Sequence, residues 1–165
     1  MDRLLSLLQN NARLTNKQLA VMLGREEEDV AKAIAAYEKS GVIRGYQAVI
    51  DWDKTDSPTV FARIEIKVTP KKDFGFEEIA RTIMELEEVQ SVSLMSGGYD
   101  LALTVSGKTF RDIAIFVAHR LSPIDSVNST ATHFILKKYK ERGVVFEEEV
   151  KDERRMTLLL SLIHI

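Results

Sequence analysis

One stretch of the chain decides its N-terminal fold: residues 15–41 have the sequence TNKQLAVMLGREEEDVAKAIAAYEKSG. Thr15 and Gln18 have the spacing of a capping box, which begins a helix, and Gly24 ends that helix after two turns. A longer helix is expected over residues 26–40, again followed by a glycine. A short helix, a glycine turn and a longer helix follow each other in this order in a helix-turn-helix unit.

The residues on either side of this stretch extend the same unit. Four leucines at positions 4, 5, 7 and 8 predict an amphipathic helix that fades at residues 9–11. Downstream, residues 42–46 (VIRGY) lead into an extended apolar segment that ends near Ile50. Three amphipathic helices also fit a small bundle with no ligand, so the helical pattern alone leaves both interpretations open.

The charges of the longer helix bear on whether the unit binds DNA. Its first turn, residues 26–29, holds four acids, which stabilise a helix N-terminus but repel a phosphate backbone. DNA contact is therefore assigned to cations of the helical segment. The candidates are Arg13, Lys17, Arg25, Lys32 and Lys39. We expect weak binding per subunit that several linked subunits restore, and the alternative is an effector-sensing module that has lost DNA binding.

The second part of the chain begins after a polar linker at residues 51–58. Residues 60–68 alternate apolar and polar side chains over their whole length, which predicts a strand. A helix over 76–86, a strand over 89–95, a turn and a strand over 101–105 follow. Thr109 and Asp112 cap a further helix, whose expected core face is Phe110, Ile113, Phe116, Val117 and Leu121, and a fourth strand is expected over 127–138.

The order βαββαβ predicts a ferredoxin-like α+β domain, an antiparallel sheet with two helices on one face, over residues 59–140. The other face of that sheet carries Phe61 and Tyr99 beside polar residues. A bare sheet face is covered most simply by a second copy, so at least a homodimer is expected.

Three segments together resemble the Lrp/AsnC (leucine-responsive, feast/famine) family of transcriptional regulators. They are residues 12–24, residues 41–46 (GVIRGY) and the turn Gly98-Tyr99-Asp100. The resemblance covers about residues 1–140. It implies a winged helix-turn-helix DNA-binding domain over 1–50, a hinge strand, and a C-terminal domain that binds an amino-acid effector and forms dimers and octamers.

The same resemblance locates an effector site at the turn after the second strand. The residues it implies there are Met95, Ser96, Gly97, Gly98, Tyr99 and Asp100. Glycines let the backbone approach a small ligand, and Asp100 can accept its ammonium group. Ser129, Thr130 and Thr132 of the fourth strand are added as hydroxyl partners. A plain hairpin turn is the competing interpretation, because Gly and Asp are common turn residues.

Composition excludes several other classes. The chain has 165 residues, of which 45% are hydrophobic and 29% charged, which is typical of a globular protein. Lys and Arg number 23 and Asp and Glu 25, so a nucleic-acid role depends on local patches. There is no cysteine, which excludes thiolate zinc and iron–sulfur sites, and no metal or cofactor is expected.

We expect no enzymatic activity. The chain has three histidines, His119, His133 and His164, and lacks the common catalytic motifs. Sirohaem decarboxylases resemble Lrp/AsnC proteins and are the enzyme alternative, but no cluster of histidine and arginine can be assembled here. With neither a signal peptide nor a long apolar run, a cytoplasmic location without membrane contact is expected.

The C-terminal residues are expected to lie outside the domain. Residues 141–155 have mixed charge and predict a solvated tail. Residues 160–165 (LSLIHI) are the translation of the transposase mosaic end used in sequencing libraries, so we expect residues 156–165 to be a non-native tail without function. The alternative is an amphipathic terminal strand or helix.

Overall fold

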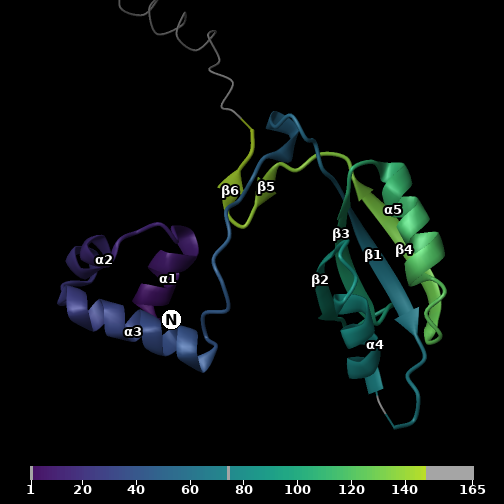
Figure 1. The fold of residues 1–165 in the computed structure, drawn as a ribbon, viewed down its shortest axis with the longest axis horizontal. Coiled ribbons are helices and arrows are strands. Elements are labelled where there is room, and N and C mark those ends of the chain that lie inside the picture. Colours follow the sequence, from purple (N-terminus) through teal and green to yellow (C-terminus); the bar gives the residue numbers. More distant parts are fainter. Residues whose placement is uncertain (1, 74, 148–165) are drawn as a thin grey trace, which may run out of the picture. The chain divides into compact units, whose positions relative to one another are not determined.

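The computed structural model describes residues 2–73 and 75–147, which fall into two compact units (Figure 1). Of the described residues, the first unit comprises 2–50 together with 140–147, and the second comprises Asp51–Tyr139. The suspected non-native tail at 156–165, with His164, lies outside the described residues.

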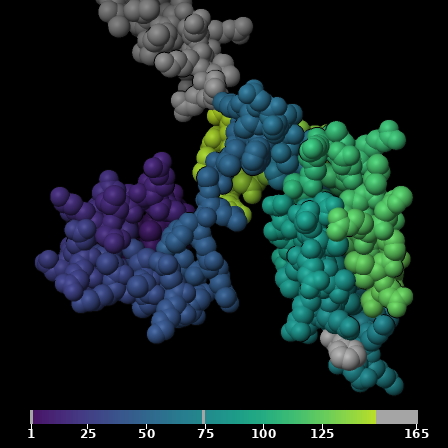
Figure 2. Space-filling model, in the orientation of Figure 1, coloured from purple at the N-terminus to yellow at the C-terminus, as the bar shows by residue number. Residues whose placement is uncertain are grey.

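Three helices form the first unit: α1 (Arg3–Asn10), α2 (Asn16–Leu23) and α3 (Glu27–Ser40). The capping box at the start of α2 is present, with both hydrogen bonds between Thr15 and Gln18. Gly24 and Gly41 end α2 and α3 in the left-handed conformation. The helices bury Leu4, Leu8, Leu19, Ala20 and Val30, and side chains fill the space between them (Figure 2). The predicted helix-turn-helix arrangement is confirmed.

The segment after α3 differs from the strand that the resemblance implied. Ile43 packs against the helical core, but residues 44–51 lie in neither helix nor strand. The side chains of Val42, Tyr46 and Ile50 are exposed. A strand is defined by hydrogen bonds to a neighbouring strand, and in this single chain the segment has none within the part that the structure describes.

A short hairpin occupies the start of the segment expected to be a solvated tail. Strands β5 (Lys140–Glu141) and β6 (Val144–Val145) are joined by Arg142 and Gly143, whose φ angles are 46° and 84°. Positive φ at both central residues is the requirement of a two-residue hairpin turn. Arg142 also donates a 3.2 Å hydrogen bond to Gln47, so the hairpin contacts the segment that follows α3.

The second unit has the predicted βαββαβ order. After the 3₁₀ turn η1 (Trp52–Lys54), its elements are β1 (Val60–Val68), α4 (Gly75–Met84), β2 (Val89–Leu94), β3 (Leu101–Gly107), α5 (Phe110–Phe116), the π-helical turn η2 (Val117–Leu121) and β4 (Val127–Ile135). The antiparallel sheet has the order β2-β3-β1-β4, which places β1 between β3 and β4. The predicted fold class is confirmed.

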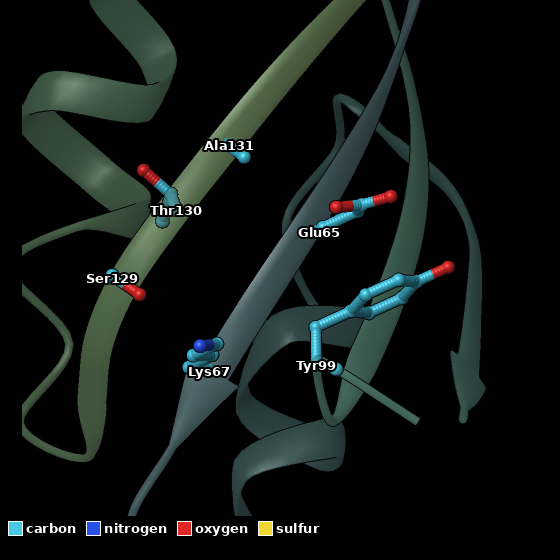
Figure 3. A pocket seen from close by; sticks show the side chains of 7 residues that line it. Glu65, Lys67, Tyr99, Ser129, Thr130 and Ala131 are labelled. Atoms are coloured by element: carbon cyan, nitrogen blue, oxygen red, sulfur yellow. The ribbon is translucent and has the colours of Figure 1, made fainter. Parts of the chain in front are cut away.

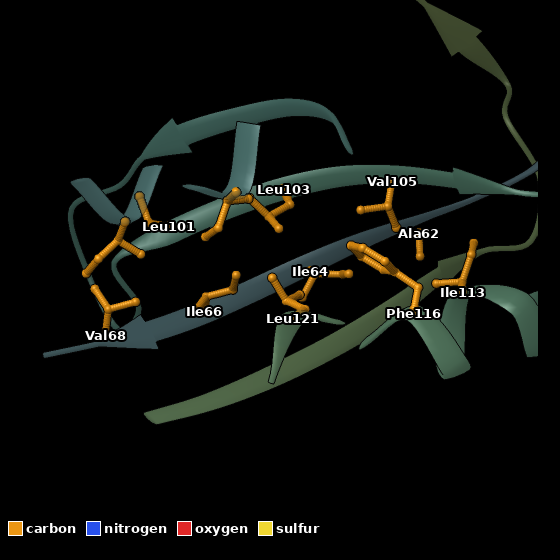
Figure 4. Packing of buried hydrophobic residues seen from close by; sticks show 12 residues of the cluster. Ala62, Ile64, Ile66, Val68, Leu101, Leu103, Val105, Ile113, Phe116 and Leu121 are labelled. Carbon is orange, nitrogen blue, oxygen red and sulfur yellow. The ribbon is translucent and has the colours of Figure 1, made fainter. Parts of the chain in front are cut away.

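The core of the second unit lies between the sheet and its two helices. Alternate residues of β1, including Ile64 and Ile66, are fully buried beside Leu103 of β3 (Figure 4). Ile113, Phe116 and Leu121 cover them from α5 and η2, while Ile79 and Ile83 do so from α4. These helices therefore lie on one side of the sheet, and no described element of the second unit covers the other side.

One predicted core residue was wrong, and several predicted element ends differ from the observed ones, the end of the fourth strand the most. Phe110 was placed in the core, yet it is 38% exposed at the first position of α5, where its ring lies 4.9 Å from that of Phe134. The fourth strand ends at Ile135 rather than at Lys138, because its pairing with β1 ends where Phe61 meets Ile135. None of the helices in the described part of the chain is long and apolar enough to cross a membrane.

Candidate effector site and DNA-binding surface

The uncovered face of the sheet is polar. Because side chains alternate along a strand, β1 directs Phe61, Arg63, Glu65 and Lys67 to the side opposite its buried residues. The register then fixes their neighbours on β4, where Ser129 lies opposite Lys67, Ala131 opposite Glu65 and His133 opposite Arg63. We call this side of the sheet the open face.

One end of the open face is hollowed out (Figure 3). This open-face hollow has a volume of about 330 Å³ and is bounded by β1, β4 and the turn between β2 and β3. Its lining residues are Glu65, Lys67, Gly98, Tyr99, Ser129, Thr130 and Ala131. The hollow therefore combines an acid, a base, an aromatic ring and a hydroxyl group within a space that fits a small molecule.

Two side chains of the open face contact the walls of the hollow. The guanidinium of Arg63 donates a 3.3 Å hydrogen bond to the Tyr99 hydroxyl. The Glu65 carboxylate lies 3.6 Å from Nε2 of His133 on β4. Glu65 and Lys67 are two residues apart on one strand, so their Cα atoms are about 7 Å apart on the same face. A ligand in the hollow thus lies beside one acidic and one basic side chain of the same strand face.

Only some of the residues expected at the effector site line the hollow. Gly98, Tyr99 and Ser129 do so with their side chains or backbone. Thr130 also borders it, but its side chain and that of Thr132 belong to the helix-covered face, because they pair with the buried Ile66 and Ile64 of β1. Figure 3 shows the hydroxyl groups of Ser129 and Thr130 pointing in opposite directions. The structure does not bring the three hydroxyl groups together.

The turn residues upstream of Gly98 are not part of the lining. Met95, Ser96 and Gly97 lead into the turn, and the Met95 amide donates to the Asp100 carbonyl at 2.8 Å. Asp100 holds the turn against β1: its Oδ2 accepts from the Val68 amide at 2.9 Å, and its own amide donates to the Ile66 carbonyl at 2.9 Å. One oxygen of this carboxylate is therefore already used by the backbone.

The sequence interpretation missed Glu65, Lys67 and Ala131 as lining residues. The alternation of residues 60–68 was sufficient to put Glu65 and Lys67 on one face. It could not show that this end of the face lies beside Tyr99 and Ser129, because that depends on the pairing of strands distant in the sequence.

A second candidate surface lies on α3 of the helix-turn-helix unit. Its inner side carries the buried Val30 and the half-buried Ile34. The opposite side is formed by Glu28, Lys32, Ala35 and Lys39, which lie at positions i, i+4, i+7 and i+11 and are all exposed. We call these four residues the outward stripe. Of the four acids in the sequence at 26–29, Glu28 is the one that belongs to it.

An ion pair joins two residues of the outward stripe. The Lys32 ammonium lies 2.9 Å from the Glu28 carboxylate, and the two side chains are 70% and 80% exposed. The stripe carries one acid, Glu28, and two bases, Lys32 and Lys39, so its net charge is +1. The other candidate DNA-binding cations are exposed as well: Arg13 in the turn before α2, Lys17 in the first turn of α2 and Arg25 in the turn before α3.

A hydrogen bond joins α3 to the residue that caps the N-terminus of α1. The Tyr37 hydroxyl donates to the carboxylate of Asp2, which also caps α1 by accepting from the Leu4 and Leu5 amides. The bond from Tyr37 is the main reason that the pKa of Asp2 is lowered, and the same bond raises the pKa of Tyr37. The positive charge of Arg25 adds to the lowering at Asp2.

Comparison with known families assigns both units. Residues 61–145 match the Lrp/AsnC ligand binding domain, and residues 3–44 match a winged helix-turn-helix DNA-binding domain. The chain is 47% identical over 152 residues to the uncharacterized HTH-type transcriptional regulator YugG of Bacillus subtilis, covering 92% of each chain. It is 28% identical to the leucine-responsive regulatory protein of Haemophilus influenzae, covering 84% of this chain and 83% of that one.

Solved structures show the same fold. A transcriptional regulator of Neisseria meningitidis in complex with L-methionine superposes with a TM-score of 0.70 at 22% identity, over 92% of this chain and 97% of that one. AsnC of Escherichia coli does so with a TM-score of 0.67 at 21% identity, over 87% and 97% of the two chains.

Proposed function

The chain belongs to the Lrp/AsnC family of helix-turn-helix transcriptional regulators, and we propose that the effector it senses is a free amino acid bound in the open-face hollow. The chain carries a ligand-binding domain and a DNA-binding domain of that family. The Neisseria meningitidis structure of the same fold contains L-methionine, which supports an amino acid as the class of effector.

The main support for this proposal is the pair of opposite charges, Glu65 and Lys67, that line the hollow. A free amino acid presents an ammonium and a carboxylate group, and the hollow offers Glu65 for the first and Lys67 for the second. Charge-assisted hydrogen bonds of this kind are about twice as strong as neutral ones. Gly98 leaves room for the ligand's backbone atoms, and the Tyr99 ring provides an apolar wall for its side chain.

A thermal-shift screen with the twenty amino acids tests the proposal. A ligand at one hundred times its dissociation constant should stabilise the protein by about 2.7 kcal/mol. Glu65→Gln and Lys67→Gln should each weaken binding by about 1.5–3 kcal/mol, because each removes one charged hydrogen-bond partner. Glu78→Gln is the matched control, since Glu78 is exposed on α4 at the other side of the sheet.

Two results would contradict this effector site. One is the absence of a shift with any amino acid. The other is a shift that both hollow variants leave unchanged, which would place the effector elsewhere in the ligand-binding domain.

We further propose that the outward stripe and the neighbouring cations contact the operator. Lys32 and Lys39 lie on the stripe, while Arg13, Lys17 and Arg25 are exposed elsewhere in the helical unit. Each cation that neutralises a phosphate should contribute about 0.9 to the slope of log K against log salt. Lys39→Ala should therefore weaken binding to the protein's own upstream DNA and flatten that slope in a gel-shift titration. Binding of an amino acid without a shift of any fragment at about 50 mM salt would favour a sensor that has lost DNA binding.

We propose that the protein regulates transcription without catalysing a reaction. We also propose that it acts in the cytoplasm, as a homodimer or a larger homo-oligomer such as an octamer. His133 lies on the open face beside Glu65, whereas His119 lies in η2 on the helix-covered side. This separation argues against the histidine cluster that a sirohaem decarboxylase-like reaction would require. We expect the visible absorption spectrum of an acidic tetrapyrrole to be the same with and without the protein, because the protein does not convert it.

A further inference from the structure

Glu28, the acid on the outward stripe of α3, needs a hydrogen-bond donor as its partner when the helix is bound to DNA. Glu28 is 80% exposed and lies in the first turn of the helix. The N-terminal residues of a recognition helix contact base edges in the major groove. There a carboxylate is repelled by phosphates on both sides, and it is tolerated when it accepts a hydrogen bond from a base. The exocyclic N4 amine of cytosine is the usual donor to Glu or Asp.

Lys32 places a hydrogen-bond donor beside the acceptor of Glu28, and the two groups together fit one base pair. Its ammonium lies 2.9 Å from the Glu28 carboxylate, one helical turn further along the stripe. In the major groove, the N4 donor of cytosine lies beside the O6 and N7 acceptors of the paired guanine. The Glu28 carboxylate can therefore accept from cytosine N4 while the Lys32 ammonium beside it donates to guanine O6 or N7 of the same base pair.

We propose that Glu28 and Lys32 together read one C·G base pair in each half-site, with Glu28 accepting from cytosine N4 and Lys32 donating to guanine O6 or N7. This inference rests on the operator binding proposed above. The positive charge of Lys32 beside the carboxylate reduces its repulsion from phosphate. The other acids of the first turn, Glu27 and Asp29, lie off the stripe and have no part in the readout.

Selection of bound sequences from randomised DNA duplexes tests the pair, with the full-length protein at about 50 mM salt. The wild type should enrich C·G at one position of each half-site. A good contact of this kind discriminates by about 1–3 kcal/mol, which corresponds to about 5- to 150-fold. Glu28→Gln should shift the preference at that position to A·T, because Gln pairs with adenine N6 and N7. Lys32→Ala should reduce the preference for C·G without creating a new one.

Glu27→Gln is the matched control, because it removes the same charge from the neighbouring, off-stripe position. It should leave the base preference unchanged, and all variants should keep the helical circular dichroism of the wild type, since the altered side chains are exposed.

Uniformly tighter binding of Glu28→Gln to all duplexes, with no change of preferred base, would overturn the readout and leave operator binding intact. Failure of the wild type to bind any duplex would overturn both the readout and the operator binding on which it rests.

Discussion

Asp100 connects the turn between β2 and β3 to the end of β1. Its carboxylate accepts from the Val68 amide, which lies at the end of β1 beside the turn. Asp100→Ala leaves that half-buried donor without its partner, and we expect a loss of about 1.5–3 kcal/mol in the free energy of unfolding. Asp100→Asn keeps an acceptor oxygen and should lose less. Urea unfolding of the two variants measures the difference. Wild-type stability of Asp100→Ala combined with lost amino-acid binding would instead assign the carboxylate to the effector.

The hydrogen bond between Tyr37 and Asp2 predicts a pH dependence of stability in acid. It holds the pKa of Asp2 below the ordinary value of about 3.9, so the unfolded chain takes up its proton first as the pH falls. The stabilisation is therefore present above about pH 4 and is lost as the pH falls through the lowered pKa of the folded protein. Tyr37→Phe keeps the ring and removes the bond.

Urea unfolding at pH 5 and pH 3 should show a smaller loss of stability for Tyr37→Phe than for the wild type. Identical losses in the two proteins would show that this bond does not stabilise the folded state. Tyr37 itself has a raised pKa, so its contribution is present below about pH 10 and is lost as the pH rises through the raised value.

Individual residues show where the sequence was sufficient and where it was not. Gly98 and Tyr99 were found from the resemblance and do line the hollow. The effector contact of Asp100 stays a prediction. The sequence did not reveal that one oxygen of its carboxylate accepts from the Val68 amide. The separation of Ser129 from Thr130 and Thr132, by contrast, follows from simple strand alternation and could have been foreseen.

Among the elements, α5 depends on a cap that the sequence specifies locally. Thr109 accepts from the Asp112 amide and Asp112 accepts from the Thr109 amide, both at 3.1 Å. Thr109→Ala removes one of these bonds and should lower the free energy of unfolding by about 1 kcal/mol. Thr82→Ala is the control, because Thr82 is exposed within α4 and alanine has the higher helix propensity. Equal effects of the two changes in urea unfolding would contradict the capping role.

Helix starts and strand alternation were predictable because they depend on residues within one turn or one strand. Both capping boxes and the whole of β1 agree with the prediction. The end of α5 was not predictable: it widens into the π-helical turn η2, which keeps Leu121 buried while Arg120 reaches Glu88 at the start of β2. Phe110 also satisfied the helical spacing of a core residue, but its position before the first full turn leaves it at the surface.

For the whole molecule, the open face predicts self-association. Ser93 of β2 lies on that face, because it pairs with Ala102, which in turn pairs with Glu65. Ser93→Glu places a charge where a second copy would exclude water, and it should shift the protein towards monomer in light scattering at micromolar concentration. Thr82→Glu, on exposed α4, should leave the mass unchanged. A wild-type protein that is already monomeric would contradict the prediction.

The place of β1 at the centre of the sheet has a consequence for synthesis on the ribosome. β1 leaves the exit tunnel well before its partners, since β3 follows roughly 30 residues later and β4 roughly 60 residues later. At ordinary elongation rates, the nascent strand waits about 3 to 12 s for its second partner. During that time both of its edges are open to other nascent chains. Arg63, Glu65 and Lys67 place a charge at every second position of the waiting strand, and charges in that pattern disfavour pairing with other nascent chains.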